Sequence, residues 1–271
     1  MSETSGEVRF QFGQNWKDYS RTVDDEKLRA AIAGLIRLIP DSLDPSGKSF
    51  LDIGSGSGLH SVAASRLGFG SITATDYDRN SVEATRLNAS RFGAAITSLQ
   101  DDILKTKLTG HFDVVYSWGV LHHTGDMKKA VRTAAALVRP GGHLILALYR
   151  KSPMCGTWRG IKHAYCISPA PIKKVAEIGF FGVMAAAHRI AGKGSGDYAD
   201  RGMNLYHDAV DWLGGYPYES AAPEDIDELV GPGLSRIQEF NTRPAPIRGV
   251  LGTGCAEYVL ARTPPKTTFP L

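Results

Sequence analysis

Short apolar runs alternate with helical segments between Ser49 and Tyr149, and this alternation restricts the fold more than any other feature of the sequence. The apolar runs, which we expect to form buried strands, are Ser49–Ile53, Ser71–Thr75, Ala95–Leu99, Phe112–Ser117 and His143–Tyr149. The segments between them place apolar residues at helical spacing, and they are Leu59–Leu67, Arg79–Phe92 and Met127–Val138. This order predicts a doubly wound α/β domain with a mostly parallel sheet.

The remainder of the chain breaks this rhythm. We divide the chain into a lid or strap (1–23), a core (24–150), an inserted helical cap (151–222) and a segment that completes the core sheet (223–271). Helices are expected over Ile172–Ile190 and Asn204–Leu213 of the insertion, and an antiparallel hairpin over Leu234–Asn241 and Cys255–Arg262 at one sheet edge. Ligands of such sheets bind beyond the carboxyl ends of the strands, so the insertion is expected to cover a binding site there.

Composition argues against several classes of protein. A net charge of +3 is too small to indicate a nucleic-acid partner. Cys155, Cys166 and Cys255 are widely spaced without a CxxC pair, which argues against a disulfide scaffold or a metal site. The N-terminus lacks a secretion-type apolar run, and the longest apolar stretch, Ile178–Ala187, is about half of what spans a bilayer. We therefore expect a soluble cytoplasmic protein.

A glycine-rich turn after the first expected strand is the strongest local signal for a ligand. It reads DIGSGSG from Asp52 to Gly58, and such a turn lets the backbone approach a ligand closely. Dinucleotide-binding turns have a third glycine five positions after the first, where this chain has Leu59. A carboxylate at Asp52 would repel a pyrophosphate but suits a ligand that carries an ammonium and a sulfonium. Both features disfavour an NAD-dependent oxidoreductase.

Acidic residues lie at the ends of three successive expected strands. Asp52 ends the first strand, Asp76 closes the second and Asp102 follows the third. Asp76 lies about twenty residues beyond the glycines, where a carboxylate accepts hydrogen bonds from ribose hydroxyls. Tyr77 can cover an adenine face, and Asp102 can accept from the adenine amino group. One such acid is usually an ordinary loop residue, whereas three at successive strand ends predict a nucleoside site.

These residues, with Ser117-Trp118-Gly119-Val120-Leu121-His122-His123 and Arg139-Pro140-Gly141-Gly142, resemble the class I S-adenosylmethionine-dependent methyltransferases. The resemblance implies a seven-stranded sheet with an antiparallel last strand, and S-adenosylmethionine as cofactor with S-adenosylhomocysteine as product. With the strap aromatics added, the expected cofactor-binding residues are Trp16, Tyr19, Asp52, Gly54, Ser55, Gly56, Asp76, Tyr77, Asp102, Ile103, Ser117 and His122. The segment after the fourth strand is similar to quinone and sterol methyltransferases, which act on small molecules.

Two pairs of residues are candidates for a general base. Methyl transfer from a sulfonium is an in-line displacement, and a hydroxyl acceptor benefits from a base that takes its proton. His122 and His123 are adjacent and should point apart, so only His123 is the base candidate; its alternative is a structural loop histidine. His207 and Asp211 are four apart on an expected helix, either as a base oriented by a carboxylate or as an ordinary surface His–Asp hydrogen bond.

Tyrosines near the expected cleft are candidates for acceptor contacts, and these are Tyr149, Tyr206, Tyr216 and Tyr218. The last two flank Pro217, where a cis peptide bond would fix both rings, either to line a pocket or to anchor the cap.

The segment Trp158–Lys193 joins an apolar run to basic residues, which are Lys162, Lys173, Lys174, Arg189 and Lys193. One interpretation is a helix that meets a membrane or a lipid-like substrate. The favoured one is a helix packed on the core with a solvated basic face.

We therefore predict a methyltransferase for a small-molecule acceptor with an oxygen nucleophile. The alternatives are a macromolecular acceptor, a lipid-like acceptor at a membrane surface, and a binding protein that has kept only the fold. Enzymes that methylate base nitrogens carry an Asp/Asn-Pro-Pro-aromatic stretch after the fourth strand, where this chain has Ser117-Trp118-Gly119-Val120, so no nucleic-acid partner is expected. The sequence does not assign an oligomeric state.

Overall fold

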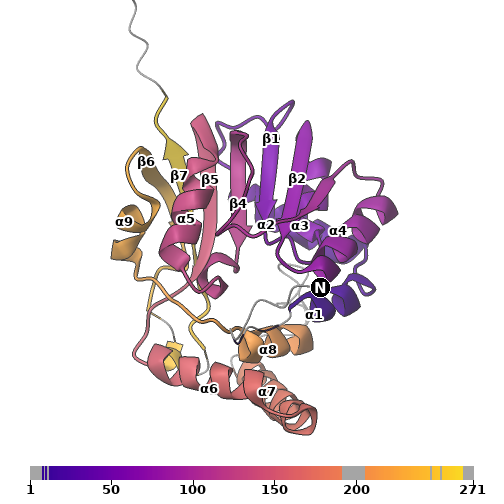
Figure 1. Ribbon diagram of the computed structural model, residues 1–271, viewed down its shortest axis with the longest axis vertical. Coiled ribbons are helices and arrows are strands. Elements are labelled where there is room, and N and C mark those ends of the chain that lie inside the picture. Colours follow the sequence, from indigo (N-terminus) through magenta and orange to yellow (C-terminus); the bar gives the residue numbers. More distant parts are fainter. Residues whose placement is uncertain are drawn as a thin grey trace, which may run out of the picture.

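The computed structural model describes residues 8, 10, 12–190, 205–244, 246–250 and 252–264 of the chain. Figure 1 shows helices around a single twisted sheet. The strands are β1 (Ser49–Ile53), β2 (Ser71–Asp76), β3 (Thr97–Gln100), β4 (Phe112–Trp118), β5 (Val138–Tyr149), β6 (Leu234–Phe240) and β7 (Cys255–Arg262). The helices are α1 (Phe12–Ser20), α2 (Asp25–Ile36), α3 (Leu59–Arg66), α4 (Arg79–Arg91), α5 (Met127–Ala136), α6 (Cys155–Ile167), α7 (Ala170–Ile190), α8 (Leu205–Gly214) and α9 (Ile226–Val230).

The sheet has the order β3-β2-β1-β4-β5-β7-β6, with β7 antiparallel to both of its neighbours. The pairs β1–β2, β1–β4, β2–β3 and β4–β5 are parallel. The predicted fold class is therefore confirmed, including the terminal hairpin at one edge and the cap. The strand order reverses between β1 and β4, and doubly wound sheets form a ligand crevice at that point, beyond the carboxyl ends of the strands.

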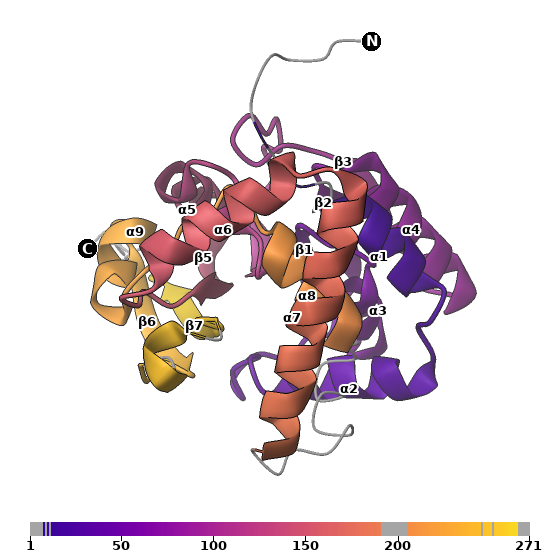
Figure 2. The same cartoon turned by 90° about the horizontal axis from the view of Figure 1, so that it is seen from below.

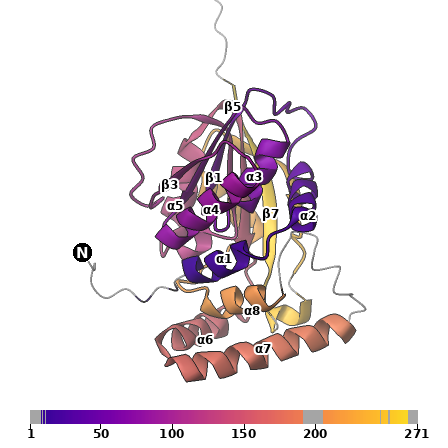
Figure 3. The ribbon, with the colours of Figure 1, turned by 90° about the vertical axis from the view of Figure 1, so that its right-hand side faces the viewer.

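Apolar clusters bury both faces of the sheet. Val114 and Val115 are adjacent on β4 and both fully buried, because successive side chains of a strand point to opposite faces. Val115 packs into the cluster that includes α5 and α9, and Val114 into the cluster that includes α2 and α3. Figure 3 shows α2 and α5 on opposite sides of the sheet. Burial on both faces explains why the strands read as continuous apolar runs.

The start of β5 differs from the prediction. The expected helix Met127–Val138 ends at Ala136, and Val138 already pairs with Phe112 of β4. The pairing then shifts, so that His143 lies opposite Val114. Gly142 packs there so closely that a Cβ would lie 2.8 Å from the Asp113 carbonyl oxygen. The Pro-Gly-Gly segment is therefore an irregularity within the strand and not a break before it.

The cap helices α6, α7 and α8 lie beyond the carboxyl ends of the strands (Figures 1 and 2). The sequence did not predict α6, whose buried residues are Trp158, Lys162 and Tyr165. A lysine within the buried stripe interrupts the apolar periodicity that would have indicated the helix. None of the described helices combines the length and apolarity needed to cross a membrane.

A few predictions concern residues outside the described ones, and these include Lys193 and the expected helix start at Asn204. The same is true of the outer parts of the segments 1–23 and 223–271.

Candidate active site

A cavity of about 1420 Å3 lies between the sheet and the cap. One part, the loop half, is lined by the loops after β1, β2 and β3, and its residues include Asp52, Gly54, Ser55, Gly56, Asp76, Tyr77, Asp102 and Ile103. The other part, the cap half, is lined from β4, β5, the cap and β6, and its residues include Trp118, Tyr149, Phe180, Met184, Asp208, Asp211, Trp212 and Phe240. Trp16 and Tyr19 of α1 also line the cavity.

The glycine-rich turn has a backbone shape that side chains would disturb. Gly54, Gly56 and Gly58 all have positive φ, a region that L-residues rarely adopt. The N–H groups of Gly54 and Ser55 donate to the Thr75 carbonyl over 2.7 and 3.0 Å, which fastens the turn to β2. A Cβ on Gly56 would lie 3.0 Å from the Trp16 ring. The turn is therefore fixed between β2 and α1, with its backbone exposed to the cavity.

Two buried carboxyl groups face this half of the cavity. Asp76 accepts hydrogen bonds from the N–H groups of Gly56 (3.0 Å) and Asp78 (2.9 Å), yet burial raises its pKa to about 6. Burial raises the pKa of Asp52 to about 7, with the Asp76 charge adding to the shift and a 2.6 Å hydrogen bond from Ser61 opposing it. Among the described residues, neither forms an ion pair with a lysine or arginine. Such a pair of carboxyls suits a ligand that brings a cation and hydroxyl donors.

Residues that follow β3 complete the loop half of the cavity. Asp102 follows β3 and accepts a 3.0 Å hydrogen bond from the Leu104 N–H, which holds its own turn in place. Ile103 is buried, while Tyr77 is half exposed at the cavity. The predicted grouping of residues after β1, β2 and β3 is thus present around one space.

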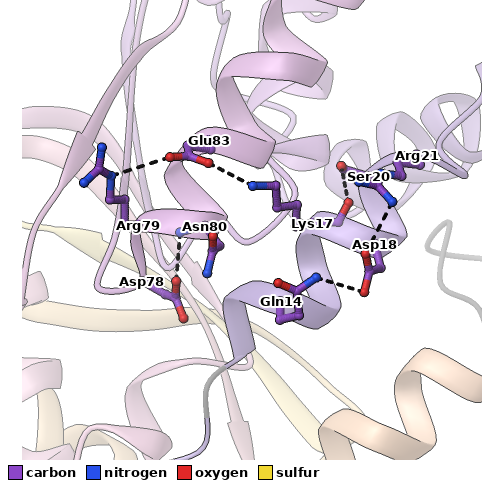
Figure 4. Close-up of polar contacts among 9 residues, drawn as sticks. All are labelled: Gln14, Lys17, Asp18, Ser20, Arg21, Asp78, Arg79, Asn80 and Glu83. Carbon is purple, nitrogen blue, oxygen red and sulfur yellow. Dashed lines mark hydrogen bonds and ion pairs between the residues drawn. The ribbon is translucent and has the colours of Figure 1, made fainter.

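Helix α1 ties the strap to the core. The Gly13 N–H donates to the Asp78 carboxylate over 3.1 Å, and Asp78 also caps α4 by accepting from the Asn80 N–H. Lys17 pairs with Glu83 of α4 at 3.0 Å, as Figure 4 shows. These contacts place Trp16 over the glycine-rich turn, and Tyr19 meets the Trp16 ring edge to face.

The structure does not bring two of the expected cofactor contacts to the cavity wall. The Ser117 hydroxyl is buried and donates to the Ile53 carbonyl over 3.0 Å, which joins β4 to β1. His122 is fully buried and stacks on Tyr149 with ring centroids 3.9 Å apart. Burial and the neighbouring His123 hold the pKa of His122 well below its usual value. Both side chains therefore pack behind residues that line the cavity, Ser117 against Ile53 and His122 against Tyr149.

His123 lines the cavity after the end of β4. Its Nδ1 lies 2.7 Å from the Pro217 carbonyl oxygen, which can only accept, so Nδ1 carries a proton, and in the neutral imidazole Nε2 has the lone pair. Phe12 packs against the ring at 5.3 Å, and a Cβ on Gly215 would lie 2.6 Å from its Cε1. The imidazole is therefore held in one orientation and one tautomer by groups from α1 and the segment after α8.

The expected direct contact between His207 and Asp211 is wrong, because Asn15 of α1 lies between them. Asn15 Oδ1 accepts from His207 Nδ1 at 2.5 Å, and Asn15 Nδ2 donates to Asp211 at 2.7 Å. Asp211 and Asp208 line the cavity, whereas His207 is not among the lining residues. Burial, with the Asp208 charge adding, raises the pKa of Asp211 to about 8. Local spacing alone could not reveal a partner 196 residues away.

Among the four tyrosines, only Tyr149 lines the cavity. The Tyr206 hydroxyl donates to Glu177 over 2.7 Å, and Tyr216 packs on His163. Tyr218 is buried and donates to the Cys155 sulfur. The Tyr216–Pro217 bond is cis. The other three tyrosines therefore contribute to the packing of the cap.

The prediction that the basic residues of Trp158–Lys193 form a solvated face is wrong for Lys162. Its side chain is fully buried, and Nζ donates to the Trp212 carbonyl and lies 3.9 Å from the Trp212 ring centroid. Burial lowers its pKa to about 7. The sequence assigned no role to Phe240 of β6, and it named Trp118 of β4 only as part of a motif; both residues line the cavity.

This sheet order, with carboxyls at successive strand ends around a glycine-rich turn, defines the class I methyltransferases, which use S-adenosylmethionine. A family model described as a methyltransferase domain matches residues 24–204, which is more than half of the chain. The chain therefore belongs to the family of methyltransferase domains, and the resemblance and the cofactor stated from the sequence are confirmed.

Relatives and solved structures agree with this class. A ubiquinone biosynthesis O-methyltransferase of Xanthomonas axonopodis is 34% identical over 115 residues, which cover 41% of this chain and 47% of the relative. The Proteus mirabilis protein of the same name is 32% identical over 108 residues, or 39% and 44% of the two chains. The chain thus spans about half the length of the curated relatives it matches.

Two solved structures share the fold. An N-methyltransferase of Bradyrhizobium japonicum in complex with S-adenosylhomocysteine matches with a TM-score of 0.53 and 15% identity, covering 93% of this chain and 98% of that one. A magnesium protoporphyrin IX methyltransferase of Synechocystis, also with bound S-adenosylhomocysteine, matches with a TM-score of 0.51 and 16% identity, covering 96% and 90%.

Proposed function

We propose that this chain transfers a methyl group from S-adenosylmethionine to an oxygen of a small-molecule acceptor, with His123 as general base. One observation carries the proposal. A single cavity joins the buried carboxyls of the loop half to the aromatic wall of the cap half, and His123 is in its lining. Donor and acceptor can therefore meet beside a residue that can take a proton.

The loop half suits the cofactor. S-adenosylmethionine supplies an electrophilic methyl group when bound. Asp76 can accept from the ribose hydroxyls, Asp52 can neutralise the ammonium, and Tyr77 can cover the adenine, since all three line this half. The raised pKa values of both carboxyls fit this role, because a cationic ligand stabilises their ionised forms and removes the electrostatic cost of burying them unpaired.

The cap half suits a flat or apolar acceptor. Tyr149, Trp212 and Phe180 provide apolar ring surface, and Asp208 and Asp211 provide acceptors for hydroxyl donors. A small molecule held there would be screened from bulk water by α7 and α8, and exclusion of water favours an in-line displacement.

The proton of the acceptor hydroxyl would pass to Nε2 of His123. The Pro217 carbonyl holds the proton on Nδ1, so Nε2 has the lone pair that a base needs. No covalent intermediate with the protein is required. An amine acceptor would need less help from His123, since it reacts when neutral, so dependence on this residue distinguishes the two acceptor classes.

A macromolecular acceptor is the weaker alternative. The cavity lies beneath α7 and α8, and the residues that line it include Met184 and Trp212 of these helices. A nucleic acid or protein chain would have to pass this cap, whereas a small molecule can be enclosed by it.

Calorimetry and labelled methyl transfer test the proposal. S-adenosylhomocysteine should bind and NAD should not, and incubation of a metabolite extract with isotopically labelled methyl donor should label a small molecule. Asp76→Ala protein is the matched control and should give far less label at the same concentration of methyl donor. NAD binding without S-adenosylhomocysteine binding would overturn the cofactor assignment, and label found only in protein or RNA would overturn the acceptor class.

A further inference from the structure

The outer side of the cap carries an unusual set of large apolar side chains. They are exposed on two consecutive helices, and we call them the cap face: Ile161 and Ile167 of α6, and Ile172, Val175, Ile178, Val183 and Ile190 of α7. Val175 is 73% exposed and Ile190 is 88% exposed. Single exposed apolar residues are ordinary, but a group on adjoining helices marks an interaction surface.

The two sides of α7 have different environments. Phe180, Met184 and Ala187 line the cavity, at spacings of four and three residues that place them on one side of the helix. Val175 and Ile178 lie on the opposite side, Val183 and Ile190 lie on the flank between the two sides, and all four are exposed. Figures 2 and 3 show α6 and α7 as the outermost layer of the molecule, with α8 between them and the sheet. Within the described part of the chain, nothing packs on this outer side.

The charges near the cap face have one sign. From Cys155 to Ile190 the sequence contains a single carboxylate, Glu177. It accepts from the hydroxyls of Tyr165 and Tyr206 and pairs with Lys174 at 3.3 Å, so its charge is already matched by one lysine. Beyond that pair, Arg159 and Arg189 are exposed on the same two helices, and Lys173 is partly exposed. The apolar residues are therefore bordered by positive charge.

We propose that the cap face docks on the surface of an anionic lipid bilayer, without crossing it. Helices that lie in a membrane interface combine an apolar side with a basic border, and anionic headgroups attract such borders. A second copy of this chain fits less well. Two copies that pair through the same surface bring like groups together, so positive borders would face each other.

Docking would place the cavity near the bilayer, separated from it by the cap helices α7 and α8. This orientation gives an acceptor dissolved in the membrane a short route into the cap half. That consequence rests on the proposed function, but docking itself does not, because it depends only on the outer side of α6 and α7.

Vesicle flotation tests the docking surface with the full chain. The protein should float with vesicles of phosphatidylcholine and phosphatidylglycerol, and not with phosphatidylcholine alone. Raising the salt from about 0.1 M to about 1 M shortens the screening length from about 10 Å to about 3 Å, and should release much of the bound protein.

Variants separate the apolar and charged contributions. Val175→Gln with Val183→Gln leaves the charge unchanged and should weaken anionic-vesicle binding by about tenfold, since it removes two apolar contacts. Leu87→Gln is the matched control, because Leu87 is 58% exposed on α4, away from the cap, and should leave flotation unchanged. All three substitutions are at exposed positions, and S-adenosylhomocysteine binding with an unchanged melting temperature checks folding.

Three outcomes would overturn the proposal. They are equal flotation with neutral vesicles, no flotation at all, and a dimer in sedimentation that the double substitution dissociates. If S-adenosylhomocysteine binds but vesicles do not, only the docking proposal fails. If vesicles bind but S-adenosylhomocysteine does not, only the proposed function fails.

Discussion

The two halves of the cavity differ in how the fold supplies their polar groups. In the loop half, Asp52 pairs with Ala74 across β1 and β2, so sheet register fixes Asp76 two residues further along, on the same face of the sheet as Asp52. In the cap half, Asp211 is held by Asn15, which is 196 residues away on α1. One half is therefore defined by neighbouring strands, and the other by helices that meet from distant parts of the chain.

This difference separates two sets of properties. The loop half should control cofactor affinity, because its carboxyls and backbone N–H groups are fixed by the sheet. The cap half should control turnover and the choice of acceptor. Substitutions that change one property and leave the other intact would support the division, and those that change both would contradict it.

The largest expected effect is on turnover. We expect His123→Ala to lower kcat about 10²–10⁴-fold for a hydroxyl acceptor, because removal of a general base usually costs this much. Single-turnover rates with saturating labelled methyl donor provide the measurement, once the acceptor is known. His207→Ala is the control and should change the rate much less, since His207 does not line the cavity.

Calorimetric affinity for S-adenosylhomocysteine should remain unchanged in both histidine variants. If His123→Ala turns over normally, either the acceptor is an amine or the base lies elsewhere.

Cofactor affinity should depend most on Asp76. We expect Asp76→Ala to weaken S-adenosylhomocysteine binding by about 10²-fold, because each hydrogen bond to a charged group contributes about 1.5–3 kcal/mol. Titration calorimetry measures the change. Asp208→Asn, in the cap half, should leave this affinity within about twofold of the unaltered protein. Asp208 is on α8, and the strand pair that positions Asp52 and Asp76 does not include it. Equal losses in both variants would remove the distinction between the halves.

The same difference explains what the sequence could predict. Asp52, Asp76 and Asp102 follow strands that short-range patterns identify, and parallel strands bring their carboxyl ends to one edge. The mostly parallel sheet with its antiparallel last strand, and the grouping of residues in the loop half, could therefore be predicted from residue spacing together with the family resemblance. The buried roles of Ser117 and His122 were not, because which side of the wall a residue occupies depends on packing.

The cap was less readable for physical reasons. The buried Lys162 hides the periodicity of α6, and its contacts with Trp212 form only when two helices pack. The link from His207 through Asn15 to Asp211 joins three side chains that no local pattern connects. Long-range side-chain contacts of this kind require the tertiary structure.

Proton linkage gives a smaller effect that is specific to the loop half. Asp52 and Asp76 have pKa values of about 7 and about 6, above the ordinary aspartate value, so the folded chain holds more protons than the unfolded chain at mildly acid pH. Stability of the ligand-free protein should therefore fall as the pH rises from about 4 to about 7.

Ligand affinity should change in the opposite direction. The ammonium and ribose hydroxyls of the ligand prefer ionised carboxyls, so affinity for S-adenosylhomocysteine should rise by about tenfold over the same interval. Calorimetry across pH measures this rise, and Asp76→Asn should flatten it. An affinity that is constant with pH would show that these carboxyls do not contact the ligand.

Helix α1 contacts both halves of the cavity, so two substitutions in this one helix can compare them. The expected changes in the free energy of unfolding are the smallest of those predicted. Asn15→Ala removes the hydrogen bonds to His207 and Asp211 and should lower the free energy of unfolding by about 1 kcal/mol. Lys17→Ala removes only a partly exposed ion pair with Glu83 and should cost less than about 0.5 kcal/mol. Urea unfolding of both variants measures these values. Asn15→Ala should also lower kcat more than cofactor affinity, because Asn15 holds the cap half, and the reverse pattern would assign α1 to the loop half alone.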